Sequence, residues 1–265
     1  MNINLNIKMV VADLDRTLLR TDKTISGYTA EVLSLCRERG IKVVFATSRN
    51  FGAVVGFIDE KVRPDALALT NGALLYADNQ YVRKVFMPDD VRDKMINNLI
   101  ARGVTKIGAR SETTKYTNRR ILQDDNKSWD FKDKIPEPVL RISVHHDRAD
   151  DVFAAAAGLD ELTVYTVDGE DVIDIDSTAG GKWNAVKFLS EYYAIPVSMI
   201  AAFGDDFNDI EMLRNCGVGV AVANALDEAK AAADYICDTN NKDGPARWIA
   251  EHCIVPRTKS ASDNR

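Results

Sequence analysis

Apolar runs that end abruptly at polar residues recur along the chain. They cover Ile7 to Ala12, Ile41 to Ala46, Ala66 to Leu69, Met199 to Phe203 and Val218 to Val222, with single lysines inside the first two. Short apolar runs of this kind are typical of strands that are buried on both faces of a parallel sheet. The pattern therefore predicts a parallel sheet with polar residues at the carboxyl ends of its strands.

Helical patterns lie between these strands. Ser26 offers an N-cap and Gly40 a helix stop, around a segment that places Val32 and Cys36 on one stripe. A strand, a helix and a second strand form a βαβ unit, whose crossover is right-handed in nearly all proteins and brings both strand ends to one edge. Further helices are expected at Asn50 to Glu60, from Lys182 onward, up to Cys216, at Leu226 to Ala233 and at Pro245 to His252.

The middle of the chain has a different pattern. A hairpin is expected from Leu74 to Met87, and a helix after Pro88. Polar alternating strands follow at Val139 to His145, Leu162 to Val167 and Asp171 to Asp176, with an alanine-rich helix near Asp150 to Gly158. We therefore predict an α/β fold, with a Rossmann-like parallel-sheet core at residues 1–87 and 177–265 and an inserted α+β domain at residues 88–176.

Composition and charge narrow the range of partners. The 265 residues are 46% hydrophobic and carry a formal net charge of −6, which argues against a binder of duplex nucleic acid. Small anionic ligands fit if positive charge or a metal is supplied locally. Four scattered cysteines read as reduced thiols, and the polar breaks in the N-terminal stretch match neither a signal peptide nor a membrane span. We expect a cytoplasmic protein without membrane or nucleic-acid partners, and the oligomeric state is not predicted.

The strand ends carry the candidate chemistry. Asp13 and Asp15 follow the first strand, Thr47 the second, and Asp205 and Asp209 the strand that ends at Phe203. Several carboxylates at one point repel one another unless a cation or a proton relieves them. Oxygen ligands without His or Cys suit Mg²⁺, which also binds phosphate groups. Thr47 would add a hydroxyl, and Lys182, at the start of the helix just before the last of these strands, would add a positive charge.

These residues match a family in order and spacing. Asp13-Leu14-Asp15-Arg16-Thr17, Thr47, Lys182 and Gly204-Asp205-x-x-Asn208-Asp209 resemble the four motifs of the haloacid dehalogenase-like phosphohydrolases. Thr70-Asn71-Gly72-Ala73, the position of the insertion and the segment from Asp234 to Gly244 resemble the Cof-type branch, and the likeness covers about residues 7 to 252. Two positions depart from the pattern: Arg16 and Ser48 stand where the family often has glycine.

The resemblance implies a Mg²⁺-dependent phosphatase for a small phosphorylated metabolite, with a sugar phosphate as the expected substrate and the inserted domain as a cap that selects it. Asp13 would attack phosphorus and form an aspartyl-phosphate, and Asp15 would carry the protons. The implied metal ligands are Asp13, Asp15 through its backbone carbonyl, Asp205 and Asp209. The implied phosphate and substrate contacts are Thr47, Ser48, Arg49, Asn71, Lys182 and Asn208.

Other interpretations stay open at this point. The fold could transfer phosphoryl groups between sugar hydroxyls, as in phosphomannomutase-like relatives, or Arg16 could leave a catalytically weak phosphometabolite-binding protein. A phosphorylatable response-regulator module also combines acidic residues, Thr and Lys, but it lacks so large an insertion. Residue by residue, Lys182 could be an exposed lysine at a helix start, Arg49 a solvated cation, and Asn71 a turn residue.

Overall fold

The computed structural model describes residues 5–59, 61–117, 126–130, 133–166 and 172–254, which form two sheets. The larger sheet has eight strands in the order β14-β13-β12-β1-β2-β3-β4-β5. Its strands are β1 (Met9–Ala12), β2 (Lys42–Ala46), β3 (Ala66–Leu69), β4 (Leu74–Ala77), β5 (Gln80–Lys84), β12 (Ile200–Gly204), β13 (Val218–Val222) and β14 (Tyr235–Cys237). All neighbours from β14 to β3 pair in parallel, so the predicted parallel core is confirmed, and the β3–β4 and β4–β5 pairs at one edge are antiparallel.

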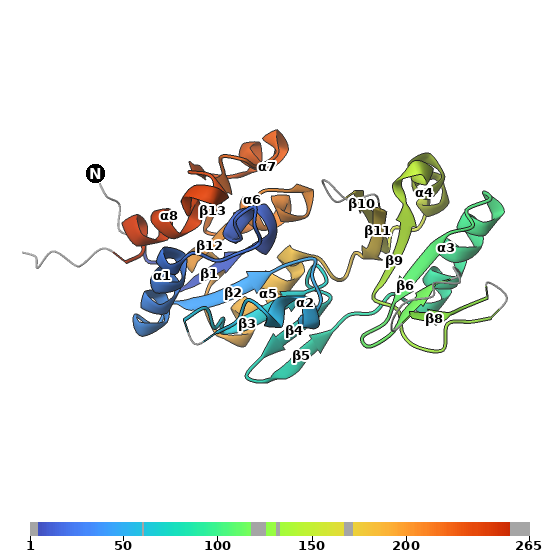
Figure 1. The fold of residues 1–265 in the computed structure, drawn as a ribbon, viewed down its shortest axis with the longest axis horizontal. Coiled ribbons are helices and arrows are strands. Elements are labelled where there is room, and N and C mark those ends of the chain that lie inside the picture. The colour runs from blue at the N-terminus through green and yellow to red at the C-terminus, as the bar shows by residue number, and fades with distance from the viewer. Residues whose placement is uncertain (1–4, 60, 118–125, 131–132, 167–171, 255–265) are drawn as a thin grey trace, which may run out of the picture.

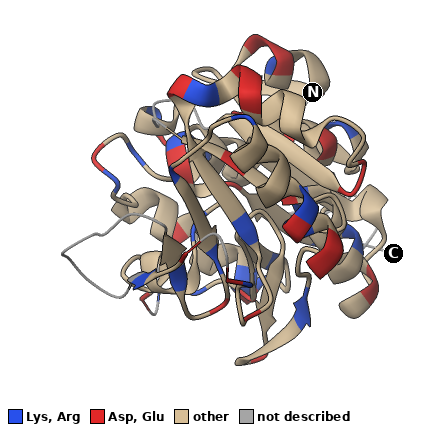
Figure 2. Ribbon diagram, turned by 90° about the vertical axis from the view of Figure 1, so that its right-hand side faces the viewer, with Lys and Arg blue, Asp and Glu red and all other residues tan. Residues whose placement is uncertain are grey.

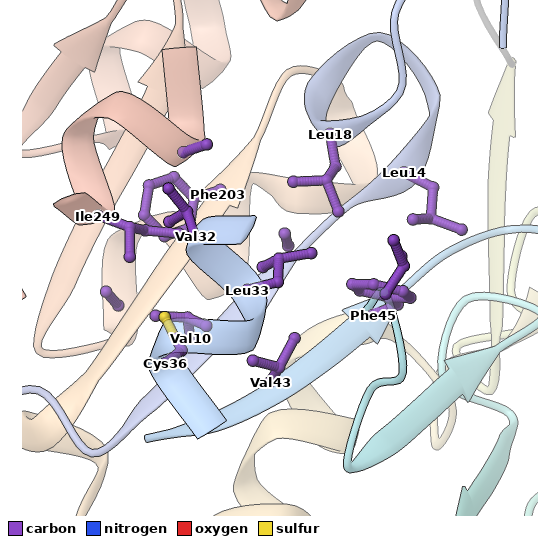
Figure 3. Packing of buried hydrophobic residues seen from close by; sticks show 14 of the residues in the cluster. Val10, Leu14, Leu18, Val32, Leu33, Cys36, Val43, Phe45, Phe203 and Ile249 are labelled. Carbon is purple, nitrogen blue, oxygen red and sulfur yellow. The ribbon is translucent and has the colours of Figure 1, made fainter. Parts of the chain in front are cut away.

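Helices cover both faces of this sheet (Figure 1). They are α1 (Gly27–Glu38), α2 (Phe51–Val55), α5 (Lys182–Tyr192), α6 (Ile210–Asn215), α7 (Asp227–Ala232) and α8 (Gly244–His252). Successive side chains of a strand point to opposite faces. Val10 accordingly packs with Val32 of α1 and Ile249 of α8, as Figure 3 shows, whereas Val11 packs with Val186 of α5. Burial on both faces explains why these strands read as continuous apolar runs.

The predicted ends of α1 and the predicted start of α2 agree with the structure, but the predicted end of α2 does not. Ser26 accepts a hydrogen bond from the Thr29 amide at 3.0 Å, and Gly40 has a φ of +71°. Helix α2 ends at Val55, so the prediction of helix beyond residue 56 was wrong. Beyond it, the Asp59 carboxylate accepts hydrogen bonds from the Lys61 and Val62 amides. Side chains of this type compete with the helix for backbone donors.

The second sheet belongs to the segment from Asp89 to Ser177, which we call the cap. Its order is β10-β11-β9-β6-β7-β8, and its pairs are antiparallel except β7–β8. The cap elements are α3 (Asp89–Ala101), β6 (Ile107–Arg110), β7 (Lys115–Thr117), β8 (Asn126–Ser128), β9 (Arg141–His145), α4 (Ala149–Ala156), β10 (Leu162–Thr166) and β11 (Val172–Ser177). The cap has its own apolar cluster, and Figure 1 shows it standing beside the core.

Strand β11 differs from the half-exposed strand that its alternating sequence suggests. Ile173 and Ile175 are fully buried in the cap cluster, and Asp174 and Asp176 on the other face are each only 5% exposed. The polar face of β11 therefore lies against other protein groups. The limits of residues 88–176 for the inserted domain stay a prediction, and Val167 and Asp171 lie outside the described residues.

Acidic and basic residues are interspersed in the view of Figure 2. No helix within the described part of the chain has the length and hydrophobicity needed to cross a membrane. Cys36, Cys216, Cys237 and Cys253 are free thiols, as their scattered spacing predicts.

Candidate active site

The carboxyl ends of three neighbouring strands meet at one edge of the core sheet. Ala12, the last residue of β1, pairs with Phe45 of β2 on one side and with Phe203 of β12 on the other. Asp13, Thr47 and Asp205 follow these strands directly. Side chains at such an edge face the crevice where α/β proteins bind ligands.

Three buried carboxylates gather here. Carboxylate oxygens of Asp13, Asp205 and Asp209 lie within 4.8 Å of one another. The Lys182 ammonium bridges two of them, because its Nζ donates to Asp13 Oδ1 and to Asp209 Oδ1, both at 2.6 Å. Lys182 is only 2% exposed, so it is not a solvated lysine at a helix start.

Burial and like charge shift the pKa values of this cluster. Burial raises the pKa of Asp13 well above its usual value, against the attraction of Lys182 and with the repulsion of Asp209. Burial, followed by the charge of Asp209, raises the pKa of Asp205 to about 7. Burial would lower the pKa of Lys182, but Asp13 and Asp209 raise it above its usual value. The cluster thus carries more negative charge than one ammonium balances.

This donor set fits a hard divalent cation. The three carboxylates offer oxygen ligands only, and they lie close enough to share one ion. A divalent cation would also relieve the repulsion that raises the pKa of Asp205. Asp206 is not part of this cluster: its carboxylate accepts a hydrogen bond from the Phe207 amide at 2.7 Å and caps the turn.

Asp15 stands apart from the three carboxylates. Arg49 donates to it through Nε at 2.6 Å and through Nη2 at 2.7 Å, and Lys23 Nζ donates at 2.7 Å. Burial acts to raise the pKa of Asp15, but the hydrogen bonds from Arg49 and Lys23 lower it to about 2. Arg49 is therefore paired with a site carboxylate and is not a solvated cation.

The turn after β1 connects to the carboxylate cluster. Thr17 donates from Oγ1 to Asp205 Oδ1 at 2.7 Å, and Arg16 Nε lies 3.5 Å from Asp205 Oδ2. Arg16 has a φ of +60°, a left-handed conformation that favours glycine. Its carbonyl accepts a hydrogen bond from Asn224 Nδ2 at 2.8 Å, which ties the turn to the loop after β13.

The loop after β12 folds back on Asp209. The second oxygen of Asp209, Oδ2, accepts hydrogen bonds from the Asp205 amide at 2.9 Å and the Asp206 amide at 3.1 Å. A Cβ at Gly204 would lie 2.4 Å from the Asp209 Cβ, so only glycine fits where the strand enters this loop. Backbone amides thus hold one oxygen of Asp209, while Lys182 holds the other.

Three of the predicted substrate contacts, Thr47, Asn71 and Asn208, lie together. The Asn71 amide donates to the Thr47 carbonyl at 2.9 Å, and Asn208 Nδ2 donates to Asn71 Oδ1 at 3.1 Å. Thr47 is fully buried and its Oγ1 accepts from the Arg49 amide at 3.2 Å, while Ser48 between them is half-buried. Asn71 is both a turn residue, with a φ of +52°, and part of this site.

A cavity of about 750 Å³ lies between the cap and the sheet edge where β1, β2 and β12 end. Lys182, Asn71 and Asn208 line it from the core, and Tyr165 and Asp176 line it from the cap. Its volume is in the range of small-molecule sites. The arrangement can therefore hold an anionic group at the edge and the rest of a ligand beneath the cap.

Sequence reasoning gave no role to several residues of this site. Thr17 belongs to the quoted first motif, so its position was the available signal. Lys23 lies in a turn with a φ of +65°, and nothing in its local sequence pattern marks it. Tyr165 and Asp176 sit on cap strands that looked solvated.

Comparison with known proteins gives the family. The chain matches the haloacid dehalogenase-like hydrolases over residues 10–249. A 5-amino-6-(5-phospho-D-ribitylamino)uracil phosphatase of Bacillus subtilis is 26% identical over 262 residues, which cover 92% of this chain and 97% of the relative. A pyridoxal phosphate phosphatase of Escherichia coli is 24% identical over 273 residues, which cover 93% and 99%.

Solved structures agree in fold. A haloacid dehalogenase-like hydrolase from Bacteroides thetaiotaomicron superposes with a TM-score of 0.75 at 24% identity, covering 92% of this chain and 98% of that one. A sugar phosphatase of subclass IIB gives 0.77 at 21% identity, covering 91% and 97%. The predicted fold class and resemblance are confirmed: the chain belongs to the haloacid dehalogenase-like hydrolase family.

Proposed function

We propose that the protein is a Mg²⁺-dependent phosphatase that hydrolyses a small phosphorylated metabolite, with a sugar phosphate as the expected substrate. The observation that carries the proposal is the buried Asp13 carboxylate, held by Lys182 beside Asp205 and Asp209. The family supports hydrolysis, and phosphatases among the relatives act on small phosphorylated molecules. The cavity beneath the cap would accommodate the organic part of such an ester.

The first step assigns a nucleophile to the strand end. Asp13 attacks phosphorus in line, the bond to the leaving alcohol breaks, and an aspartyl-phosphate forms. Lys182 keeps the Asp13 carboxylate oriented and offers positive charge to the phosphoryl oxygens. Asp13, Asp205, Asp209 and the Asp15 carbonyl would hold Mg²⁺, which when bound neutralises charge on the transferring group. Thr47, at the end of the neighbouring strand, would supply a hydroxyl to the same oxygens.

Asp15 is proposed to carry the protons. As an ion paired with Arg49 and Lys23, it is ready to accept a proton from the water that hydrolyses the intermediate. Donating a proton to the leaving alcohol requires the carboxyl group to move away from these cations, since their hydrogen bonds lower its pKa to about 2. Binding of an anionic ester beside Arg49 offers the guanidinium a second partner and so favours this release.

The test is phosphate release from a panel of sugar phosphates, nucleotides and pyridoxal phosphate, with and without Mg²⁺. Asp13→Asn removes the nucleophile and is expected to lower kcat by at least about 10³-fold, as loss of a covalent catalyst does. Asp206→Asn is the matched control, because Asp206 caps a turn and lies outside the cluster of three carboxylates, and should stay within a few-fold of wild type. Full turnover by Asp13→Asn would overturn the nucleophile assignment.

The same assay separates the alternatives. Isomerised sugar phosphate without net phosphate release would favour phosphoryl transfer between hydroxyls. Tight ester binding without turnover at saturating Mg²⁺ would favour a binding protein. The family match across the cap argues against a response-regulator module.

A further inference from the structure

A buried polar cluster on the cap faces the core, and the proposed mechanism uses none of its members. Arg141 of β9 lies between two aspartates of β11. Its Nη1 lies 2.6 Å from Asp174 Oδ2, and its Nε and Nη2 donate to the two oxygens of Asp176, each at 2.7 Å. All three residues are under 9% exposed. Tyr165 of β10 completes the cluster by donating its hydroxyl to Asp176.

The side chain of Asn71 connects this cluster to the core. Asn71, in the turn after β3, donates from Nδ2 to Asp176 Oδ2 at 3.1 Å and to the Tyr165 hydroxyl. Asn71 is 3% exposed, so these contacts are shielded from water. Asp174 pairs with Arg141 and accepts a hydrogen bond from Ser143, and both of these partners belong to the cap.

These contacts fix the direction of two amide groups. The Asp176 carboxylate can only accept, so Asn71 must turn its NH₂ group toward the cap and its Oδ1 toward Asn208. Asn208 must then donate its own NH₂ to Asn71 Oδ1, as it does at 3.1 Å. The carbonyl of Asn208 is left pointing the other way. The Asp176 carboxylate of the cap thereby sets the orientation of the side-chain amide of Asn208, the residue before Asp209.

The series of hydrogen bonds from Asp176 through Asn71 ends at the side-chain carbonyl of Asn208. Its Oδ1 is buried and has no hydrogen-bond partner among the residues that the structure describes. Asn208 and Lys182 both line the cavity beneath the cap. A buried acceptor without a partner is costly, and a ligand that donates a hydrogen bond relieves that cost.

We propose that Asp176 and Tyr165 are positioning residues that, through Asn71, orient the Asn208 carbonyl to accept a hydrogen bond from the leaving group of the substrate. The inference rests on the proposed phosphatase function and deepens it. The selected substrates are phosphate monoesters whose organic part carries an O–H or N–H donor near the ester, as polyhydroxy compounds do. Esters without such a donor leave the Asn208 carbonyl unsatisfied.

The test compares two kinds of ester in one protein. The readout is kcat/KM for the best sugar phosphate among ribose 5-phosphate, glucose 6-phosphate and fructose 1-phosphate, divided by kcat/KM for p-nitrophenyl phosphate, which has no donor. Asp176→Asn lets the Asn71 amide adopt either orientation, so this ratio should fall roughly tenfold. Asp174→Asn is the matched control: it removes the same charge from the Arg141 cluster without touching Asn71, and the ratio should stay within about twofold.

A second variant covers the case in which Asp176→Asn does not fold. Asn71→Gly suits the left-handed backbone of residue 71 and leaves the ion pairs of Arg141 intact, and it should lower the ratio in the same way. Equal losses on both esters, or equal effects of Asp176→Asn and Asp174→Asn, would overturn the positioning role. A wild-type protein that hydrolyses p-nitrophenyl phosphate but none of the sugar phosphates would also overturn the positioning role. A wild-type protein that releases phosphate from no ester contradicts the proposed function itself, and with it this inference.

Discussion

Arg16 combines a left-handed backbone with a charged side chain beside a carboxylate of the site. Its φ is +60°, and its guanidinium lies 3.5 Å from Asp205. The structure explains why glycine is the usual residue at this position in the family, since glycine adopts this conformation without a Cβ penalty. Through its contact with Asp205, Arg16 supplies part of the positive charge that balances the buried carboxylates.

The strain at Arg16 can be measured with two substitutions. Arg16→Gly and Arg16→Ala both remove the guanidinium, but only alanine keeps a Cβ in the left-handed region. We expect Arg16→Ala to be less stable than Arg16→Gly by about 1 kcal/mol in urea-induced unfolding. Equal stability of the two variants would show that the backbone at this position carries no such strain.

Residues of the site differ in how far the sequence reveals them. Asp13, Asp205 and Lys182 follow or precede strongly patterned elements, and parallel strands bring their ends to one edge, so their meeting could be predicted. The isolation of Asp15 could not, because it depends on Lys23, whose turn has no periodic signal. The contacts of Asp176 depend on Asn71, which is far away in sequence.

At the scale of elements, the junction between β12 and the following turn leaves no room for a side chain. Gly204→Ala would place a Cβ 2.4 Å from the Asp209 Cβ and push this carboxylate from its backbone donors. We expect a loss of about 2 kcal/mol in unfolding free energy, as for overpacked sites, and weaker Mg²⁺ binding by calorimetry. Gly27→Ala is the control, because nothing lies within 4 Å of the added Cβ in helix α1. A Gly204→Ala variant as stable as this control would contradict the steric argument.

Strands and helices were predictable where burial alone decides them. The bounds of β3 and β13 agree with the apolar runs, because strands covered on both faces have few polar residues to blur their ends. Helix α2 was overestimated because the chain leaves the helix at Gly56, where the Phe57 and Ile58 amides donate to the carbonyls three residues back, and the Asp59 side chain then binds the amides of the following turn. The polar face of β11 was judged solvated because only the tertiary fold brings Asn71 against it.

At the scale of the whole molecule, the excess of buried negative charge couples stability to pH and metal. The folded state raises the pKa of Asp205 to about 7, so it retains a proton that the unfolded chain releases near pH 4. The contribution of Asp205 to stability is therefore fully present at low pH and is lost as pH rises between these values.

Magnesium should reverse this loss. Because protons compete for the same carboxylates, saturating MgCl₂ should raise the Tm more at about pH 8 than at about pH 5 in thermal scans. Asp205→Asn should abolish most of the difference between the two pH values. A metal-induced shift in Tm that is the same at both values would contradict the proposed site.

The pairing of β1 with β12 has a consequence for synthesis of the chain. Met9 lies opposite Ile200, so the strand that carries Asp13 waits for its second neighbour until most of the protein has left the ribosome. The cap, whose apolar cluster runs from Met87 to Ile175, is complete earlier and can fold while the first strands remain open on one side. Until residues 182 and 205 have been synthesised, a nascent chain contains Asp13 but neither Lys182 nor Asp205. The chemistry proposed for Asp13 would therefore require a chain whose synthesis has passed β12.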